Sequence, residues 1–303
     1  MLENLKLEPI YDGFLYLAES TRNLPSLKSH HHIELELNLV VRGGISYVVS
    51  GRRFTFERRT LLWLFPSQEH QLVDRTSDAQ CYVAVFTPGL IARSCHSTIY
   101  EGLKRDNAGM DGVLHTRLEP ETFDLVRKTM DALMKGAPDP DVLNREAGFG
   151  VRSDFRFKHD DPDGLNAGLH HLLLLAWRVQ RPDNELGGAV PLLPAVREAL
   201  DLLSETTCEH DLGQLARRCG ASGAHLSRMF ARQVGVPMSR YRNSVRLGRF
   251  FEHFRGPERK TVTEAAYMAG FGSYAQFHRV FTRAYGRGPR ECLQARACSE
   301  ARA

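Results

Sequence analysis

Hydrophobic and polar residues alternate along much of the chain between residues 15 and 86, as they do in β-strands with two unlike faces. In ELELNLVV (34–41), leucine at every second position alternates with glutamate and asparagine. Turn residues separate this run from four further apolar runs: ISYVV (45–49), RFTF (53–56), LLWLF (61–65) and CYVAVF (81–86). Short strands with glycine and proline turns between them predict an antiparallel β-barrel or sandwich.

The spacing of apolar residues becomes helical after this region. ETFDLVRKTMDALMKG (121–136) has one apolar face, and LNAGLHHLLLLAWRVQ (165–180) is more apolar than a lone surface helix requires. We expect the second of these helices to pack either on a dimer partner or on the protein's own sheet. Residues 137–164 are rich in proline, aspartate and glycine and carry no prediction, whereas RPDNELGGAVP (181–191) has the composition of a linker.

The rest of the chain is helical in pattern to about residue 297, and it contains one motif twice. Residues 211–241 and 261–292 each place an alanine in a first helix, then a glycine, and then a serine before a second helix. That second helix carries an apolar residue, an arginine and a phenylalanine at two-residue steps, and ends at a glycine. The matched positions are Ala216 and Ala266, Gly220 and Gly270, Ser222 and Ser273, Leu226 and Phe277, Arg228 and Arg279, Phe230 and Phe281, and Gly235 and Gly286. The motif predicts two helix-turn-helix units.

Each feature of the motif has a physical reason. The small alanine lets two helices cross closely, the glycine closes the turn, and the serine caps the second helix. Apolar residues four positions apart face the core, so short polar chains and arginines remain outside, where they are suited to reading base edges in the major groove. We therefore expect DNA contacts from Ala224, Ser227, Arg228, Arg232, Tyr274, Gln276, His278, Arg279 and Arg283.

The distribution of charge agrees with this interpretation. Residues 1–205 carry 23 Lys and Arg against 29 Asp and Glu, whereas residues 206–296 carry 16 against 6. A basic module on an acidic partner indicates that one end of the protein meets a polyanion. The alternative is an ordinary helical bundle whose arginines face water, but two basic motifs in tandem favour DNA binding.

Membrane and disulfide patterns are missing from the sequence. No apolar run approaches the length of a membrane span and MLENLKLEPI (1–10) lacks a signal-peptide pattern, so we expect a cytoplasmic protein. The six cysteines form no Cys-x-x-Cys pair, which predicts neither a disulfide framework nor a zinc site.

The C-terminal hundred residues resemble the DNA-binding domain of AraC/XylS-type transcription regulators. The hallmark pattern of that family's second unit is matched by Ala266, Gly270, Phe271, Phe277, Arg279, Phe281, Thr282, Arg283, Gly286 and Pro289. The chain departs from the pattern at Cys292, where the family usually has tyrosine, and at His278, where a small polar residue is common. The resemblance implies that the two second helices enter successive major grooves on one face of the duplex.

Many regulators of this type carry a cupin-like β-barrel as effector domain, and residues 30–90 resemble one. The first cupin motif is matched by His30, His32, Glu36 and Gly43. The second motif is matched only in part by FPSQEH (65–70), which ends in His70 but has no glycine. In metal-dependent cupins, the matching three histidines and one glutamate bind a divalent metal. The run from the histidines through LLWLFPSQEHQLV is most similar to the melibiose-operon regulator subgroup, which implies a saccharide effector.

Three interpretations of the histidines remain open. Residues two positions apart on a strand point the same way, so the histidines and the glutamate share a polar face, which either lines a barrel interior or is exposed. We favour a polar effector pocket that needs no metal cofactor, formed by His30, His32, Glu36, Trp63 and His70. A divalent metal held by His30, His32, Glu36 and His70 is the second interpretation, and a purely structural role for the histidines is the third.

The sequence therefore predicts an α+β multidomain protein. A cupin-like effector-binding and dimerisation domain would span residues 1–180, with the antiparallel barrel at about 10–100 and helices at about 101–180, and a linker (181–191) would join it to an all-α domain of two helix-turn-helix units (192–296). We expect a homodimeric transcription regulator, not an enzyme, which binds promoter DNA, responds to a saccharide or related polar metabolite, and contacts RNA polymerase if it is an activator. The alternative is a metal-dependent cupin enzyme, an isomerase or dioxygenase, with a DNA-binding appendage.

Overall fold

The computed structural model describes residues 5, 7–19, 29–66, 68–106, 113–135, 157–180, 190–204, 211–254, 260–285 and 288–290. Residues 181–189 of the predicted linker lie outside this description, as do Gly286, Cys292 and most of the segment that carried no prediction.

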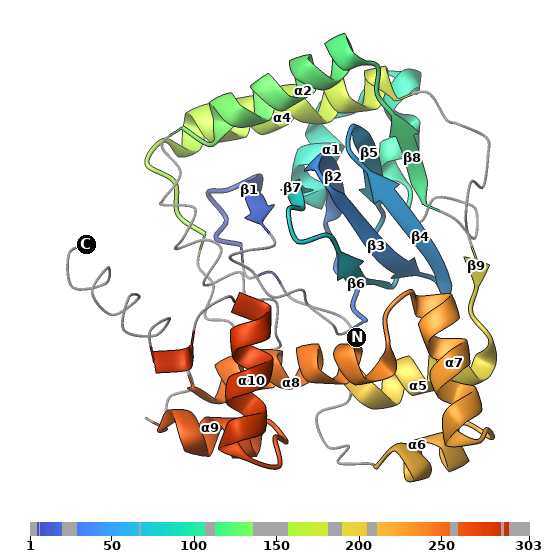
Figure 1. Ribbon diagram of the computed structural model, residues 1–303. Coiled ribbons are helices and arrows are strands. Elements are labelled where there is room, and N and C mark those ends of the chain that lie inside the picture. The colour runs from blue at the N-terminus through green and yellow to red at the C-terminus, as the bar shows by residue number, and fades with distance from the viewer. Residues whose placement is uncertain are drawn as a thin grey trace.

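The N-terminal part contains two antiparallel sheets (Figure 1). The first has the order β1-β7-β2-β5-β8 and is built from β1 (Gly13–Glu19), β7 (Gln80–Phe86), β2 (Leu35–Arg42), β5 (Thr60–Leu64) and β8 (Leu114–Arg117). The second has the order β6-β3-β4-β9 and is built from β6 (His70–Arg75), β3 (Gly44–Val49), β4 (Arg52–Glu57) and β9 (Val190–Pro191). Among the described residues, no strand of one sheet pairs with a strand of the other, so the predicted closed barrel is corrected to a pair of open sheets.

Both faces of β2 are buried, but one meets an apolar core and the other also meets polar side chains, which explains its alternation. Leu35, Leu37 and Leu39 belong to a core shared with β1, β7 and the helices that cover the first sheet. Glu36 and Asn38 point to the other side, which also carries Val40 of the core between the two sheets. Of the two possibilities for the polar face of this strand, the interior one is therefore correct.

Four helical segments accompany the first sheet: α1 (Pro88–Ser94), the 3₁₀-helix η1 (Thr98–Lys104), α2 (Pro120–Leu133) and α4 (Pro162–Val179). α2 and α4 lie side by side across one end of the molecule (Figure 1). The apolar face of α4 packs on the protein's own sheet, because Leu165, Leu169 and Leu172 are buried in the core that contains β1 and β2. Each such leucine contributes roughly 1.5–3 kcal/mol of burial free energy. None of the helices in the described part of the chain is long and apolar enough to cross a membrane.

The C-terminal part is all-helical. Its elements are α5 (Pro194–Ser204), α6 (Leu212–Arg218), α7 (Gly223–Val234), α8 (Met238–Phe254), α9 (Val262–Met268) and α10 (Tyr274–Tyr285). They form two apolar cores: α5–α7 enclose the first with the start of α8, and α9 and α10 enclose the second with the end of α8. The long helix α8 thus connects the two units (Figure 1).

The first of these units packs directly on the second sheet. Val48 of β3 and Val73 of β6 belong to the same buried cluster as Phe230 of α7. The end of the predicted linker takes part as well, since β9 pairs with β4 and the carbonyl oxygen of Pro191 accepts from Nε2 of Gln233 in α7 at 3.5 Å. The last residues of that segment are therefore an ordered part of the contact between the two domains.

Candidate DNA-binding helices and a buried histidine cluster

The two helical units begin in the same way. Asp211 and Thr261 are the N-caps of α6 and α9, and each forms a capping box with the residue three positions on. Asp211 accepts a hydrogen bond from the backbone N–H of Gln214 at 2.7 Å, and Thr261 accepts one from the N–H of Glu264 at 3.2 Å. Such caps satisfy N–H groups that have no partner within the helix and so fix where each helix starts.

The turn between the two helices of each unit is closed by a glycine. Gly220 has a φ of +65° and Gly270 a φ of +84°, a left-handed conformation that costs a residue with a side chain more free energy than glycine. The second helix then begins at a serine: Ser222 Oγ accepts from the N–H of His225 at 3.3 Å, and Ser273 Oγ accepts from the N–H of Gln276 at 3.1 Å. The predicted helix-turn-helix geometry is present in both units.

Helices α7 and α10 present their side chains in the same register. Leu226 and Phe230 of α7, and the equivalent Phe277 and Phe281 of α10, are buried to within 1% of full burial. The opposite face of each helix is exposed and carries arginines at matching positions: Arg228 and Arg232 in α7, and Arg279 and Arg283 in α10. Among the described residues, none of these four guanidinium groups forms an ion pair.

Most of the predicted DNA-contacting residues are exposed. Those fully on the surface are Ala224, Arg228, Arg232, His278, Arg279 and Arg283, and those partly buried are Ser227, Tyr274 and Gln276. Tyr274 packs its ring near that of Phe277, with centroids 5.9 Å apart. The side chain of Gln276 stabilises the turn before α10, because its Oε1 accepts a hydrogen bond from the backbone N–H of Gly272 at 3.0 Å.

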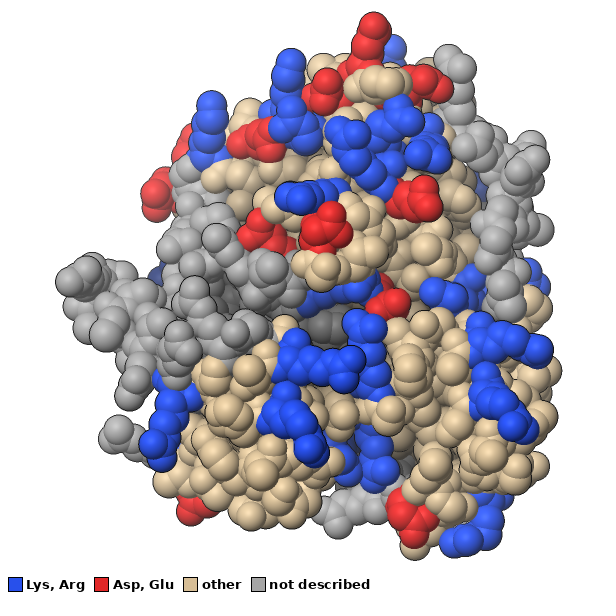
Figure 2. Space-filling model, in the orientation of Figure 1, with Lys and Arg blue, Asp and Glu red and all other residues tan. Residues whose placement is uncertain are grey.

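Lysine and arginine side chains are spread over the part of the surface formed by the C-terminal helices, where few acidic side chains are visible (Figure 2). The N-terminal domain carries both signs on the same view (Figure 2). This asymmetry matches the charge difference between the two halves of the sequence and suits a surface that meets phosphates.

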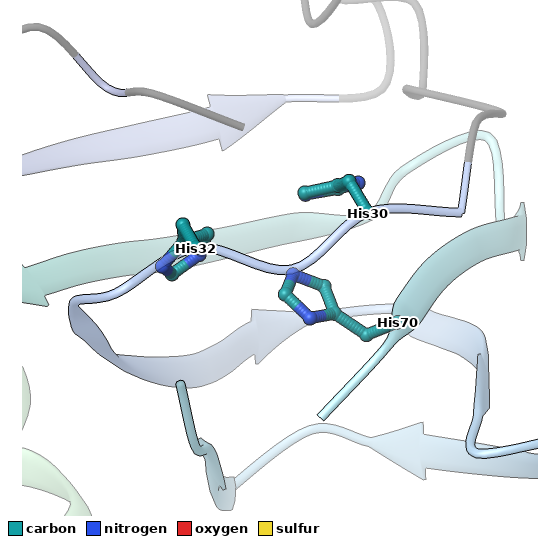
Figure 3. Close-up of side chains that lie close together, drawn as sticks. All are labelled: His30, His32 and His70. Atoms are coloured by element: carbon teal, nitrogen blue, oxygen red, sulfur yellow. The ribbon is translucent and has the colours of Figure 1, made fainter. Parts of the chain in front are cut away.

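The second candidate site is a cluster of imidazoles in the N-terminal domain. His30, His32 and His70 each offer a ring nitrogen, and these atoms lie within 4.8 Å of one another (Figure 3). His30 and His32 come from the segment before β2, and His70 is the first residue of β6 (Figure 3). All three are buried, with exposed fractions of 8%, 3% and 2%.

The carboxylate of Glu36 belongs to this cluster. Its Oε2 lies 3.2 Å from His32 Nε2 and 3.9 Å from His70 Nε2, and its Oε1 accepts from Asn38 Nδ2 at 2.6 Å. Burial alone would raise the pKa of this carboxyl, but the hydrogen bond with His32, the neighbouring imidazoles and the hydrogen bond from Asn38 lower the pKa to about 2. Glu36 is therefore an anion at neutral pH.

His70 is held with one ring nitrogen directed at the cluster. Its Nδ1 lies 2.9 Å from the carbonyl oxygen of Gln68, which can only accept, so the ring proton sits on Nδ1. Burial first and the neighbouring His30 second lower the pKa of His70 to about 3, so the ring is neutral. Nε2 is then a lone-pair acceptor, and among the described residues it has no hydrogen-bond partner.

This donor set fits a divalent transition metal. Neutral imidazoles and a carboxylate are ligands that zinc, iron, nickel and copper accept, and a histidine ligand commonly donates its other ring N–H to a backbone carbonyl, as His70 does. His32 has Nδ1 3.0 Å from the carbonyl oxygen of Glu34, so in the tautomer with its proton on Nδ1 it would match His70; its Nε2 would then bind the ion in place of the hydrogen bond to Glu36. His30, His32, His70 and Glu36 would hold the ion, and the ion would supply the positive charge that joins these acceptors.

Trp63 does not belong with the histidines. Glu36 pairs with Leu64 across β2 and β5, and Leu37 pairs with Trp63, so Trp63 lies on the opposite face of the sheet from Glu36. Its ring packs against Trp177 of α4, with centroids 5.7 Å apart. The grouping of Trp63 with His30, His32, Glu36 and His70 is thus corrected, since the parity of the two strands separates the tryptophan from the others, and an effector pocket at those four residues stays a prediction.

The sequence interpretation missed Asn38, which orients Glu36, and Cys81, whose Sγ lies 3.7 Å from Asn38 Oδ1. Asn38 was detectable, because it is two residues from Glu36 on the same strand face. A cavity of about 230 Å³ elsewhere is lined by Arg58, Arg59, Arg117, Pro120, Phe123 and Asp124, none of which is a predicted effector residue.

Comparison with known proteins supports the helical units. The family model of a helix-turn-helix domain matches residues 215–295, which include both α7 and α10. This segment is a helix-turn-helix domain. Such domains bind DNA in transcription regulators, so the predicted DNA-binding domain is confirmed at that level. No curated protein matches the chain.

Solved structures similar to the chain include two of ToxT from Vibrio cholerae. The P21 crystal form has 13% identity and a TM-score of 0.33, and the match covers 93% of this chain and 97% of ToxT. ToxT with a bound unsaturated fatty acid has 12% identity and a TM-score of 0.35, with 93% and 94% covered. The AraC-like transcriptional activator CuxR has 13% identity and a TM-score of 0.31, with 81% and 79% covered.

Proposed function

We propose that this protein is a sequence-specific transcription regulator of the AraC/XylS type, which binds promoter DNA through α7 and α10 and responds to a ligand in its N-terminal domain. The observation that carries the proposal is the equal register of the two helices. Arg228 and Arg279 each follow their serine N-cap by six residues and stand exposed on the face opposite a buried phenylalanine. Two such helices, joined by α8, are suited to two successive major grooves.

Selection of DNA sequences from a random pool tests the proposed sequence-specific binding. Full-length protein is used to select duplexes from a random pool, and binding of the selected sequence is measured by fluorescence anisotropy at several salt concentrations. We expect a motif with two parts about one helical turn (10–10.5 base pairs) apart, and an affinity that falls steeply with salt because arginines neutralise phosphates. Enrichment of no motif, together with binding that does not depend on salt, would contradict the proposal.

We also propose a homodimer formed through the helical layer of α2 and α4. Leu125 of α2 is 51% exposed, and Leu174 and Leu175 of α4 are only partly buried. Light scattering behind a sizing column measures the mass: wild type should elute as a dimer, and Leu125→Glu should shift it toward the monomer. RNA polymerase is a further partner if the protein activates transcription.

The effector has two candidate classes. A saccharide or related polar metabolite rests on the resemblance to the melibiose-operon subgroup, which no comparison supports, and it stays a prediction. The geometry of His30, His32, His70 and Glu36 supports a metal cation instead. For the alternative of an isomerase or dioxygenase, a substrate would have to reach these atoms, and the burial of all three imidazoles gives that reaction no support.

A further inference from the structure

Strand β6 has two faces that meet different parts of the molecule. Successive residues of a strand point to opposite sides. His70 points into the space between the two sheets and contributes to the imidazole cluster, while the next residue, Gln71, points out toward the C-terminal domain. Two residues later, Val73 again faces that domain and lies in the apolar core of its first helix-turn-helix unit.

The outward face is tied to helix α8. Gln71 Nε2 donates to the hydroxyl of Tyr241 at 2.5 Å, and both side chains are buried, with Tyr241 only 1% exposed. The ring of Tyr241 packs against Phe230 of α7, with centroids 5.4 Å apart. Asp74 of β6 and Arg240 of α8 form a second, longer contact of 3.9 Å in the same place. β6 therefore touches the helix that joins the two DNA-binding units and, through Tyr241, the core beneath α7.

The inward face is tied to the imidazole cluster by main chain as well as side chain. The backbone N–H of His30 donates to the carbonyl oxygen of His70 at 3.1 Å, and the N–H of His70 donates to the carbonyl oxygen of His30 at 2.9 Å. Two of the three clustered histidines thus share a backbone bridge at the first residue of β6. A change in how their rings are held acts on the backbone that also carries Gln71.

His70 Nε2 and Glu36 Oε2 face each other at 3.9 Å as two acceptors. A ligand that satisfies both must carry positive charge or donate hydrogen, and three imidazoles with one carboxylate select a transition-metal cation over an alkaline-earth cation. Such a cation would pull these groups closer together, and the movement would begin at the first residue of β6.

We propose that a divalent transition-metal cation in the cluster of His30, His32, His70 and Glu36 is the signal to which the regulator responds. Binding of the cation at this cluster would alter the DNA-binding domain through His70, Gln71 and Tyr241. This inference rests on the proposed function, since it names the regulation of that DNA binding. Coupling between two sites is reciprocal, so the cation changes the affinity for DNA and DNA changes the affinity for the cation by the same factor.

The test uses the full chain, purified without a histidine tag, and the duplex selected by the protein itself. Anisotropy titrations are made in metal-free buffer, with Zn²⁺, and with Mg²⁺ as the control ion. We expect Zn²⁺, but not Mg²⁺, to change the DNA affinity fivefold or more, and calorimetry to show Zn²⁺ binding that is altered by the same factor when DNA is present. Equal affinities with and without Zn²⁺ would overturn the inference.

Single-residue variants distinguish the proposed metal site from its proposed connection to the DNA-binding domain. His70→Ala should lose Zn²⁺ binding and the response of DNA binding to Zn²⁺, whereas His171→Ala, which removes an exposed histidine of α4, should keep both. Tyr241→Phe removes only the hydroxyl that Gln71 contacts; it should keep Zn²⁺ binding and DNA binding but lose most of the fivefold response. Tyr100→Phe, in η1, is the matched control and should respond like wild type.

The outcomes of these experiments can be told apart. Failure to bind any duplex contradicts the proposed function, whether or not Zn²⁺ binds. DNA binding without Zn²⁺ binding, or Zn²⁺ binding that also survives in His70→Ala, overturns the metal site. Zn²⁺ binding with a full response in Tyr241→Phe overturns the connection through β6. Circular dichroism melts of each variant show whether it is folded before it enters the comparison.

Discussion

Arg228 and Arg279 lie 51 residues apart in sequence and occupy the same position on two equivalent helices. The residues around them correspond one by one: Ser222 with Ser273, Leu226 with Phe277, and Phe230 with Phe281. An exposed arginine at one position of a capped helix is common on protein surfaces, but the same arginine on two tandem units indicates a shared task. Under the proposed function that task is contact with DNA, since guanidinium groups pair with guanine edges and phosphates.

Replacing either of these arginines should weaken binding to the selected duplex. For Arg228→Ala and Arg279→Ala we expect losses of roughly 10- to 100-fold each, which corresponds to about 1–3 kcal/mol for a bidentate contact with a base. Each variant should also relax the sequence preference in one half of the site only. Anisotropy with single-base variants of the duplex measures both effects. Arg105→Ala, at an exposed site of the N-terminal domain, should bind like wild type.

Arg232 and Arg283 lie one helical turn further along the same exposed faces, near the ends of α7 and α10. We expect them to contact phosphates, so Arg232→Ala and Arg283→Ala should weaken all duplexes alike and lower the slope of log affinity against log salt by about 1. Binding titrations from 50 to 200 mM salt, which is roughly the range where such slopes are measured, test this. An unchanged slope with altered sequence preference would instead assign these arginines to bases.

The two capping boxes predict separate losses of stability. Asp211→Ala and Thr261→Ala each remove the side chain that satisfies the first free N–H groups of α6 or α9, at a cost of about 1 kcal/mol. Thr261→Ser should retain the cap and most of the stability. Hydrogen exchange should rise in the first unit for Asp211→Ala and in the second for Thr261→Ala. Equal changes in both units would contradict the division into two cores.

Phe230 and Phe281 hold equivalent places in the two cores, but among the described residues only the first core includes residues of the N-terminal sheet. Replacing either by alanine should destabilise its unit by about 3–5 kcal/mol. Phe230→Ala should also raise hydrogen exchange in β3 and β6, because Val48 and Val73 lose a shared core. Phe281→Ala, the matched control, should leave those strands protected.

Much of this arrangement follows from local sequence patterns. Alternation in residues 34–41 predicts β2, and the serine, glycine and alanine spacing predicts the two helix-turn-helix units, since caps and turns depend on residues a few positions apart. The sequence also predicts that β2 has one polar face, but only the structure shows that this face is interior. Asn38 lies beside Glu36 in the histidine cluster because residues two positions apart on a strand point to the same side.

The features that depend on distant parts of the chain could not be predicted. β6 reads HQLVDR and has no simple alternation, because Gln71 is buried by Tyr241, which is 170 residues away in sequence. The sequence groups Trp63 with the histidines because the register between β2 and β5 cannot be inferred from the sequence of either strand alone. β9 lies in a segment with linker composition and becomes a strand only through its pairing with β4.

Whether both units bind one stretch of DNA is decided by the double variant Arg228→Ala/Arg279→Ala. Its affinity for the selected duplex is measured beside those of the two single variants and of wild type. If the two helices occupy separate grooves, their losses should add in free energy, since distant independent sites behave additively to within about 0.5 kcal/mol. A double variant that binds the duplex as tightly as wild type would contradict the claim.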